Sequence, residues 1–430
     1  MITLNPDQQA AKEFFQRWWD SDKRFAILEG CAGTGKTTIV SQLVAGLKDC
    51  DPLFTAPTNE ACKQLENVLP KDSLIKTIYS ALGFHFETSS EVRTLTQKAK
   101  EPPVINDINL LIIDECSMVG QTLLEAILDA NKKTLFIGHR SQLPEVIKDL
   151  SIYDDCESVV FKQEWPIYTL TTPERNKGEL FEFINTLETI IYNKPRSFKS
   201  TYNKSIAYME EYIESKEGRH DLLYEKSKVI CWSNAEVDRF NNFIRQAIFK
   251  EDVLPPFVLK DKIIMLEPCV YVEPLAGLSK GVISKFMDSS KVARFSANTK
   301  GIVRKIEQVV VLSVPCWELE VEIDRMRPLI YVPVNVGILE TLRKKLMNEC
   351  YAAVTIKAKE KAFRRYHFIL SLFAKVKHSY AITTHRSQGM TIPNVYVSWR
   401  DIKKCDNVVM RHKLLYVAAS RAKDNLTILA

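Results

Sequence analysis

Short apolar runs, rich in β-branched residues, recur along the first part of the chain and end at small or polar residues. Between them lie longer segments with the apolar spacing of a helix, such as NPDQQAAKEFFQRWW and TTIVSQLVAGLKD. This alternation predicts an α/β fold in which helices cover a parallel sheet. The predicted strands of this sheet are RFAILEG, DPLFTAP, NLLIIDE, TLFIG and IYTLT.

A second set of elements begins at KVICWSNAEVDRFNNFIRQAIF, which predicts a buried strand, a polar loop and an amphipathic helix. Its partner strands are predicted near the C-terminus, in SYAITTHRSQGM, NVYVSW and LTILA. The region between them, from about Lys260 to Lys375, contains GIVRKIEQVVVLSVPCWELEVEI, whose alternation predicts a small antiparallel β module. A shorter insertion, FHFETSSEVRTLTQKAKEPPV, interrupts the first set.

The composition of the chain narrows the classes of protein to consider. With 430 residues, 46% of them hydrophobic, the chain can build several cores of ordinary size. Its net charge of +6 permits a polyanionic partner without requiring one. Ten separate cysteines, with no C-x-x-C pair, favour reduced thiols in a cytoplasm over a zinc module. The sequence shows neither a secretion signal nor an apolar run long enough to span a bilayer, so we expect no membrane partner.

The sequence GCAGTGKT fits the pattern of a phosphate-binding P-loop, because it follows an apolar strand and precedes a helix. Backbone N–H groups of such a loop wrap the phosphates of a nucleotide, Lys36 would neutralise the β and γ oxygens, and Thr37 would present its hydroxyl to Mg²⁺. The sequence therefore predicts ATP and Mg²⁺ as cofactors. The predicted nucleotide-binding residues of this segment are Gly30, Cys31, Ala32, Gly33, Thr34, Gly35, Lys36, Thr37 and Thr38.

Two acidic residues, Asp114 and Glu115, end the apolar run NLLII at the point where open α/β sheets place their ligand sites. Asp114 is predicted to hold Mg²⁺ together with Thr37. Glu115 is predicted to orient and deprotonate the attacking water. One strand further on, Gln142 in GHRSQLPEV is a candidate contact for the γ-phosphate.

These motifs, in this order, resemble superfamily 1 helicases, especially the 5′-to-3′ subgroup of RecD-like and Dda-type enzymes. The resemblance implies two RecA-like P-loop domains, a small pin insertion in the first and a β-rich, SH3-like insertion in the second. It places the first domain at 1–82 and 105–172, the pin at 83–104, the second domain at 173–260 and 376–430, and the β-rich insertion at 261–375.

The resemblance also implies roles for residues outside the phosphate loop. Gln8 in LNPDQQAA would contact adenine, and Arg175 in LTTPERN and Arg421 in YVAASRA would contact the γ-phosphate. The segment THRSQGMTI resembles the motif that couples ATP to DNA, which places Gln388 and Gly389 near the nucleotide. The catalytic residues implied in this way are Lys36, Glu115, Gln142, Arg175 and Arg421.

Contacts with single-stranded DNA are predicted from motif position, because backbone amides, hydroxyls and stacking rings leave a weak sequence signal. Trp232 fits either base stacking or burial in the core. His385 fits a DNA or interdomain contact better than a catalytic base. The candidates are Thr58, Asn59, Thr77, Tyr79, Trp232, Asn234, Thr384 and His385.

Two features depart from the family pattern. Gly138 is followed by His139 where the family usually has aspartate, which puts the hydrogen bonding of this motif in question. The insertion FHFETSSEVRTLTQK has no clear aromatic residue at its tip, so translocation is a firmer expectation than efficient duplex opening.

Together, the motifs and the resemblance predict an ATP-dependent DNA helicase that moves 5′ to 3′ on single-stranded DNA. It would act at single-strand to duplex junctions in replication, recombination or repair. Such an enzyme would be a monomer, in the host cytoplasm if it is encoded by a bacteriophage, with replication or recombination proteins as further partners. Two alternatives stay open. One is a DNA-stimulated ATPase that remodels protein–DNA complexes without efficient unwinding, and the other is a P-loop kinase of a small molecule.

Overall fold

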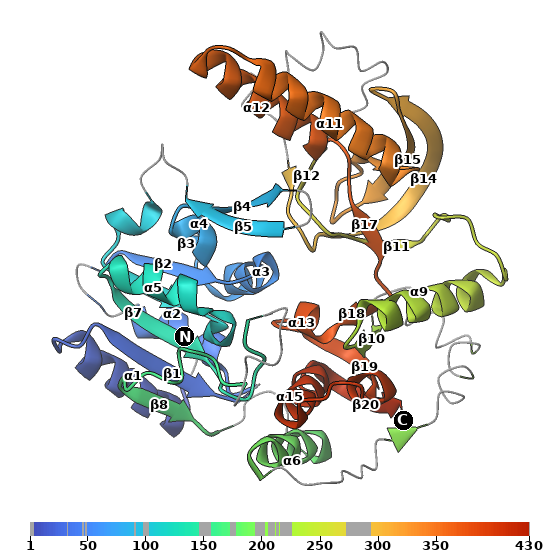
Figure 1. Ribbon diagram of the computed structural model, residues 1–430. Helices are drawn as coiled ribbons and strands as arrows, with labels where there is room; N and C mark the ends of the chain where they lie inside the picture. Colours follow the sequence, from blue (N-terminus) through green and yellow to red (C-terminus); the bar gives the residue numbers. More distant parts are fainter. Residues whose placement is uncertain are drawn as a thin grey trace. The chain divides into compact units, whose positions relative to one another are not determined.

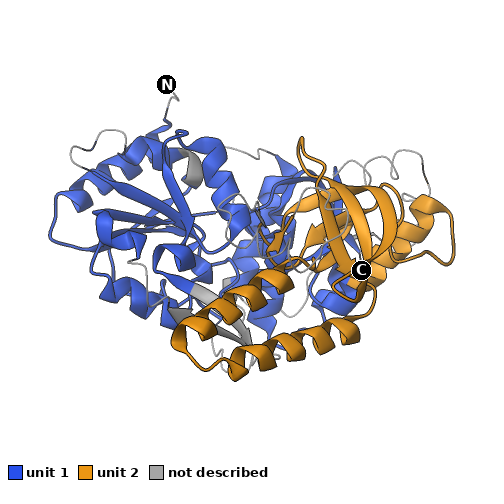
Figure 2. Cartoon of the chain, turned by 90° about the horizontal axis from the view of Figure 1, so that it is seen from above, with its two compact units in different colours: residues 1–211, 225–237, 382–430 blue, residues 212–224, 238–381 orange. Residues whose placement is uncertain are grey.

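The computed structural model describes residues 4–31, 33–44, 47, 50–89, 92–97, 103–145, 156–172, 178–193, 203–204, 211, 215, 226–271 and 294–429. The chain divides into two compact units, coloured separately in Figure 2. The first unit comprises residues 1–211, 225–237 and 382–430, and the second comprises 212–224 and 238–381. Within the described residues, no helix has the length and apolarity needed to cross a membrane.

The first unit contains a six-stranded parallel sheet built from the first part of the chain (Figure 1). Both faces of this sheet are covered, which explains why its strands are continuous apolar runs. In spatial order the strands are β3 (Leu74–Thr77), β2 (Pro52–Ala56), β6 (Leu110–Ile113), β7 (Lys133–Gly138), β1 (Phe25–Gly30) and β8 (Ile167–Leu170).

Successive residues of each strand enter different cores. In β6, Leu110 and Ile112 join the core under α1 (Pro6–Trp19), α2 (Lys36–Val44) and α3 (Asn59–Val68). Leu111 and Ile113 join the opposite core, under α4 (Ile78–Ala81) and α5 (Gln121–Asp129). The period of two residues along a strand thus builds two hydrophobic layers from one sequence.

The same unit contains a second sheet with strand order β18 (Ala381–Thr383), β10 (Ser227–Cys231), β19 (Ile392–Ser398), β20 (Ala422–Leu429) and β9 (Asn203–Lys204). Strand β19 pairs in parallel with β10 and β20, and β20 pairs in parallel with β9. Helix α15 (Val408–Ala419) is buried along most of its length and packs with α6 (Glu179–Asn193) in the core of this sheet. The predicted pair of α/β sheets is therefore confirmed.

The second unit is built on a five-stranded antiparallel sheet in the order β16 (Leu329–Pro333), β15 (Val314–Glu322), β14 (Lys300–Val311), β11 (Lys262–Met265) and β17 (Val376–His378). Gly301 lies where a side chain would overlap Val321 of the neighbouring strand. Two helices that the sequence pattern did not predict, α11 (Val336–Ala352) and α12 (Ile356–Ser371), pack on this unit's core. The unit also holds a short pair, β12 (Cys269–Val270) with β13 (Arg294–Phe295).

Several short elements complete the two units. The boundary between the units falls inside α9 (Asn234–Phe249), after Val237. In the insertion of the first half, β4 (Phe84–Ser89) and β5 (Val92–Gln97) form an antiparallel hairpin, and residues 90–91 at its tip lie outside the described residues. The remaining short helices are η1 (Val104–Asp107), η2 (Cys116–Met118), α13 (Thr384–Ser387) and α14 (Trp399–Ile402).

A buried ion pair fixes the start of β11 in the second unit. Asp261 accepts hydrogen bonds from Arg245 Nε at 2.9 Å, Arg245 Nη2 at 2.8 Å and the Val258 backbone N–H at 2.8 Å. Burial alone would raise the pKa of Asp261, but its hydrogen bonds and the nearby His378 and Arg245 lower it overall. Ionised Asp261 therefore stabilises the folded unit at pH values above the ordinary carboxyl pKa of about 4. This stabilisation is lost as the pH falls through the lowered pKa of Asp261 in the folded protein.

We expect Asp261→Asn to destabilise the second unit by about 3 kcal/mol, because Arg245 would keep a buried charge without its counterion. Amide hydrogen exchange of β11 and β14 at neutral pH should accelerate about 100-fold. Glu267→Gln is the matched control, since Glu267 forms an exposed pair with Lys375 at 3.1 Å and should change exchange little. Equal exchange in the two variants would contradict this role of Asp261.

Candidate active site

The phosphate loop connects β1 to α2 at the carboxyl edge of the first sheet. Gly33 and Gly35 have φ angles of 88° and 78°, a conformation that favours glycine. A Cβ on Gly30 would lie 2.7 Å from Thr34 Oγ1 and 3.0 Å from Leu170 Cβ, so the turn needs glycine there as well. The loop thus has the backbone shape that its sequence predicted. Ala32 and the side chains of Thr37 and Thr38 lie outside the described residues.

Lys36 begins α2, and its ammonium group bends back over the loop. Nζ donates to the backbone oxygen of Cys31 at 2.8 Å and also to that of Gly30. Burial lowers the pKa of Lys36, and the nearby carboxylates of Glu115 and Asp114 partly oppose this shift. The lysine therefore lies close to both acids that the sequence placed at the end of β6.

Asp114 and Glu115 follow β6 in a tight turn. The Glu115 backbone N–H donates to Asp114 Oδ1 at 2.9 Å, and Glu115 has a left-handed φ of 53°. A non-glycine residue in this region carries strain of about 1 kcal/mol or more, which is common at functional sites. The neighbouring strand accommodates the turn only because it ends in Gly138, where a Cβ would lie 2.7 Å from Cys116 Sγ.

Gln142 lies at the centre of the hydrogen bonds between these loops and is only 6% exposed. Its Nε2 donates to Glu115 Oε2 at 2.5 Å. Its Oε1 accepts from the His139 backbone N–H at 3.1 Å and from Ser117 Oγ at 3.4 Å. The amide therefore orients Glu115, the predicted general base, from one side.

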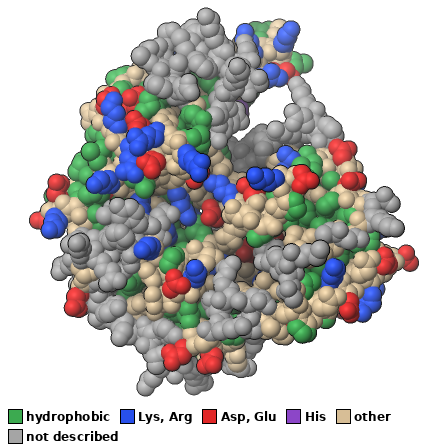
Figure 3. Space-filling view, turned by 180° about the vertical axis from the view of Figure 1, so that it is seen from behind, with side chains coloured by type: hydrophobic (Ala, Val, Ile, Leu, Met, Phe, Trp, Pro, Cys, Tyr) green, Lys and Arg blue, Asp and Glu red, His purple; other side chains and the backbone are tan. Residues whose placement is uncertain are grey.

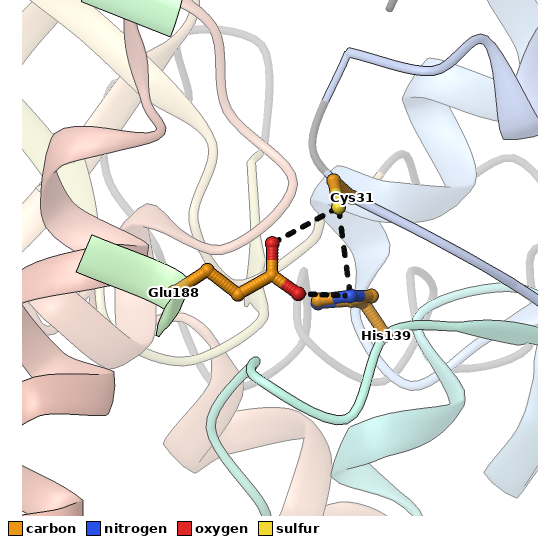
Figure 4. Close-up of side chains that lie close together, drawn as sticks. All are labelled: Cys31, His139 and Glu188. Carbon is orange, nitrogen blue, oxygen red and sulfur yellow. Dashed lines mark hydrogen bonds and ion pairs between the residues drawn. The ribbon is translucent and has the colours of Figure 1, made fainter. Parts of the chain in front are cut away.

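His139 takes a defined position in place of the usual aspartate, as Figure 4 shows. Its Nδ1 accepts from the Ser141 backbone N–H at 3.3 Å, so the ring proton is on Nε2, which lies 3.0 Å from Glu188 Oε1. Cys31 Sγ lies 3.0 Å from Glu188 Oε2 and 3.7 Å from His139 Nε2. Burial, followed by the negative charge of Glu188, raises the pKa of Cys31 to about 12, so Cys31 is a neutral thiol.

Three further charged residues complete this region, and the motif comparison did not single them out. Glu29, buried at the end of β1, accepts from Arg140 Nε at 2.8 Å and from Arg140 Nη2 at 3.0 Å. Lys413 of α15 is also buried, and its Nζ donates to the backbone oxygens of Arg140 at 2.5 Å and Cys156 at 2.8 Å. A charged residue inside the apolar run FAILEG was the one sequence signal that could have identified Glu29.

Arg421 and Gln388 come from the segments around the second sheet. Arg421 donates to the backbone oxygens of Val417 at 3.1 Å and Met390 at 3.4 Å. Its charge is one of those that lower the pKa of Lys36, which places the two cations within electrostatic range. Gln388 Nε2 donates to the Leu143 backbone oxygen at 3.4 Å. Gly389 has a φ of 77°, and Arg175 lies outside the described residues.

Gln8 forms a capping box at the start of α1. Its Oε1 accepts from the Asn5 backbone N–H at 3.2 Å, and its backbone N–H donates to Asn5 Oδ1 at 2.8 Å. The adjacent Asp7 accepts from the Thr171 and Thr172 backbone N–H groups at 2.7 and 2.8 Å. These bonds attach the start of α1 to the chain that follows β8. They also hold Gln8, the residue predicted to contact adenine, in a defined position.

The first group of predicted DNA contacts lies just after the strands β2 and β3. Thr58 and Thr77 cap the helices that follow, with their hydroxyls accepting from Ala61 N at 3.2 Å and Ser80 N at 3.3 Å. Asn59 is the first residue of α3. The Tyr79 ring is half-buried against the core, and burial followed by the charge of Glu145 raises its pKa.

The second group lies around the ends of β10 and β18. Trp232 is half-buried against the core, and its backbone N–H donates to the buried Asp401 at 2.9 Å, while Asn234 is exposed. Thr384 is buried, with Oγ1 donating to the Cys231 backbone oxygen at 3.1 Å. His385 is half-buried, and burial lowers its pKa to about 4, so its ring is neutral at physiological pH.

Two family models and several known proteins match this chain. Residues 19–148 match the family described as AAA domain, and residues 378–429 match the UvrD-like helicase C-terminal domain. The chain is 25% identical over 448 residues to the ATP-dependent DNA helicase Dda of Enterobacteria phage T4, and the match covers 98% of each chain. It is 24% identical over 484 residues to an uncharacterised protein of Acanthamoeba polyphaga mimivirus, covering 93% of this chain and 94% of that protein.

Among solved structures, the Pif1 helicase from Bacteroides in complex with ADP-AlF3 and ssDNA matches with a TM-score of 0.53 and 18% identity. The match covers 100% of this chain and 93% of that chain, and it establishes the fold. The two matched families and the pair of parallel sheets define an ATP-dependent helicase of superfamily 1. Over nearly its whole length the chain is similar in sequence to the Dda helicase, and its fold is similar to that of the Pif1 helicase.

We expect Gln142→Glu to lower kcat for ATP hydrolysis about 100-fold, because the new carboxylate would repel Glu115 instead of donating to it. The substitution keeps the size of the side chain, but its negative charge would also repel the γ-phosphate, so nucleotide affinity should fall as well. Steady-state hydrolysis and equilibrium binding of a fluorescent nucleotide measure the two quantities. An unchanged kcat would show that this hydrogen bond does not orient the general base.

Proposed function

We propose that this chain is a DNA helicase that moves 5′ to 3′ along single-stranded DNA and opens duplexes during replication, recombination or repair. The observation that carries the proposal is the hydrogen bond from Gln388 Nε2 to the Leu143 backbone oxygen at 3.4 Å, which joins segments of the two sheets. In addition, the charge of Arg421, which precedes the last strand of the second sheet, lowers the pKa of Lys36 at the edge of the first. A nucleoside triphosphate bound between them would connect the two sheets through its phosphates. Its hydrolysis would then change the interaction between them.

In this proposal, each residue of the pocket has a separate task. Gln8 contacts adenine, the phosphate loop and Lys36 hold the β- and γ-phosphates, and Glu115 takes a proton from the attacking water. Asp114 and Thr37 would hold Mg²⁺, and the oxygen chemistry of both residue types suits that ion. When bound, the metal would neutralise charge on the phosphate oxygens. Arg175 and Arg421 would stabilise the charge that develops on the γ-phosphate.

The two sheets also share direct hydrogen bonds that would transmit hydrolysis. Gln388 binds the Leu143 backbone, one residue from Gln142, and Lys413 binds the backbone of Arg140. A shift of Gln142 during hydrolysis would therefore change contacts of two segments that belong to the second sheet. We propose that this linkage converts the state of the nucleotide into movement.

Single-stranded DNA is proposed to contact the loops after β2, β3, β10 and β18. The relatives support this partner, since T4 Dda is named a DNA helicase and the matched Pif1 structure contains ssDNA. Figure 3 shows Lys and Arg side chains gathered on part of the face drawn, among acidic ones, and the whole chain carries +6. The domain boundaries derived from the sequence, with the hairpin of residues 83–104 as a pin, remain part of this proposal, as does action as a cytoplasmic monomer.

We expect ATP hydrolysis to be slow for the protein alone and to rise strongly with single-stranded DNA. With ATP and Mg²⁺, the protein should displace the labelled strand of a duplex with a 5′ tail and leave one with a 3′ tail intact. Lys36→Ala should abolish both activities, because the phosphates lose their main cation.

Three outcomes decide between the alternatives. Displacement only with a 3′ tail would reverse the proposed direction. DNA-stimulated hydrolysis without displacement of either substrate would favour a translocase that remodels protein–DNA complexes. Full DNA-stimulated hydrolysis by Lys36→Ala would contradict the proposal itself.

A further inference from the structure

A thiol, an imidazole and a carboxylate meet beside the phosphate loop, outside the residues that the proposed reaction uses as acids, bases or cation contacts. They belong to Cys31 after β1, His139 after β7 and Glu188 on α6 (Figure 4). One ligand atom from each lies within 4.8 Å of the others. The separations are 3.0 Å from Sγ to Glu188 Oε2, 3.0 Å from Nε2 to Glu188 Oε1 and 3.7 Å from Sγ to Nε2.

These three ligand types suit a borderline-soft cation and not a hard one. Zn²⁺ binds thiolate, imidazole and carboxylate in tetrahedral geometry, at about 2.3, 2.0 and 2.1 Å respectively. Such bond lengths place neighbouring ligand atoms about 3.4 to 3.6 Å apart. Sγ and Nε2 already lie 3.7 Å apart. The two short contacts of Glu188 are made by different oxygens, so one of these oxygens would have to move toward the ligand atom that it does not yet contact. Mg²⁺ prefers oxygen ligands alone, and Asp114 with Thr37 would serve it separately.

We propose that Cys31, His139 and Glu188 form a Zn²⁺-class cation site that fixes the phosphate loop to α6 and thereby inhibits ATP hydrolysis. Water would be the fourth ligand, because Glu188 is partly exposed. The inhibitory part rests on the proposed function, whereas the binding part does not.

Binding requires a defined change in protons. The Cys31 thiol loses its proton to solvent as sulfur binds the metal. The His139 proton leaves Nε2 for Nδ1 by exchange with solvent, because Nε2 becomes a ligand. In the structure, Nδ1 accepts from the Ser141 backbone N–H at 3.3 Å. This hydrogen bond would be lost once Nδ1 carries the proton. Metal binding would therefore replace the present contacts among these three side chains with bonds to the ion.

The position of the site explains the expected inhibition. The backbone oxygen of Cys31 is a hydrogen-bond acceptor of Lys36, so a restraint on this residue acts directly on the phosphate loop. Glu188 lies on a helix whose Ile184, Leu187 and Ile191 are buried in the core of the second sheet. A metal between them would prevent the loop from adjusting around the phosphates independently of α6.

Cobalt provides the direct test on the full chain, since a Co²⁺–thiolate bond gives a near-ultraviolet charge-transfer absorption. Titration with Co²⁺ alone should give this absorption with one ion per chain, and Zn²⁺ should displace it. Cys31→Ser should remove the absorption, and Glu188→Gln should weaken binding at least tenfold. Glu182→Gln is the matched control, because it makes the same change at an exposed position of the same helix.

Hydrolysis in Mg²⁺ gives the second readout. Zn²⁺ should inhibit the wild type and Glu182→Gln at the concentration that fills the site, and Glu188→Gln should need at least tenfold more. Inhibition that is equal in Glu188→Gln would place the effect at the Mg²⁺ site and overturn the inhibitory role. Absence of the thiolate absorption, or its persistence in Cys31→Ser, would overturn the site. A clear cobalt signal in a protein that never hydrolyses ATP would instead contradict the proposed function alone.

Discussion

The desolvated ammonium group of Lys36 is the constraint on which the site depends. Burial lowers its pKa, and Arg421 adds a second positive charge within electrostatic range. Asp114 and Glu115 offset only part of this unfavourable charge. A triphosphate would add negative charge between the two cations, so its binding and its hydrolysis must both alter how strongly the two sheets interact. In the proposed mechanism, the same electrostatics would link phosphate binding to movement of the two sheets.

The sequence was informative wherever a function depends on neighbouring residues. The phosphate loop needs glycines and a lysine at fixed spacing, and Asp114 and Glu115 need only the end of a buried strand. These features follow from local backbone geometry, so the strand, loop and helix order was sufficient to predict them. The two parallel sheets could also be predicted from the sequence, because strands that are covered on both faces are continuous apolar runs.

The sequence was uninformative where partners are distant along the chain. Nothing near Glu188 indicates that it meets Cys31, 157 positions earlier, or His139. The buried Asp401, which accepts from the backbone of Trp232 and Ser233, was missed for the same reason. Helices α11 and α12 were also missed, since the alternating strands before them dominated the interpretation of that region. Long-range pairs of this kind depend on the fold as a whole.

A double-mutant cycle between Lys36 and Arg421 tests the central claim most directly. The measured quantity is kcat/KM of DNA-stimulated ATP hydrolysis for Lys36→Met, Arg421→Met and the double variant. If one triphosphate contacts both residues in the transition state, the double variant should be little worse than the more damaged single variant. Strictly additive losses would mean that the two cations act independently, and the shared pocket would be wrong.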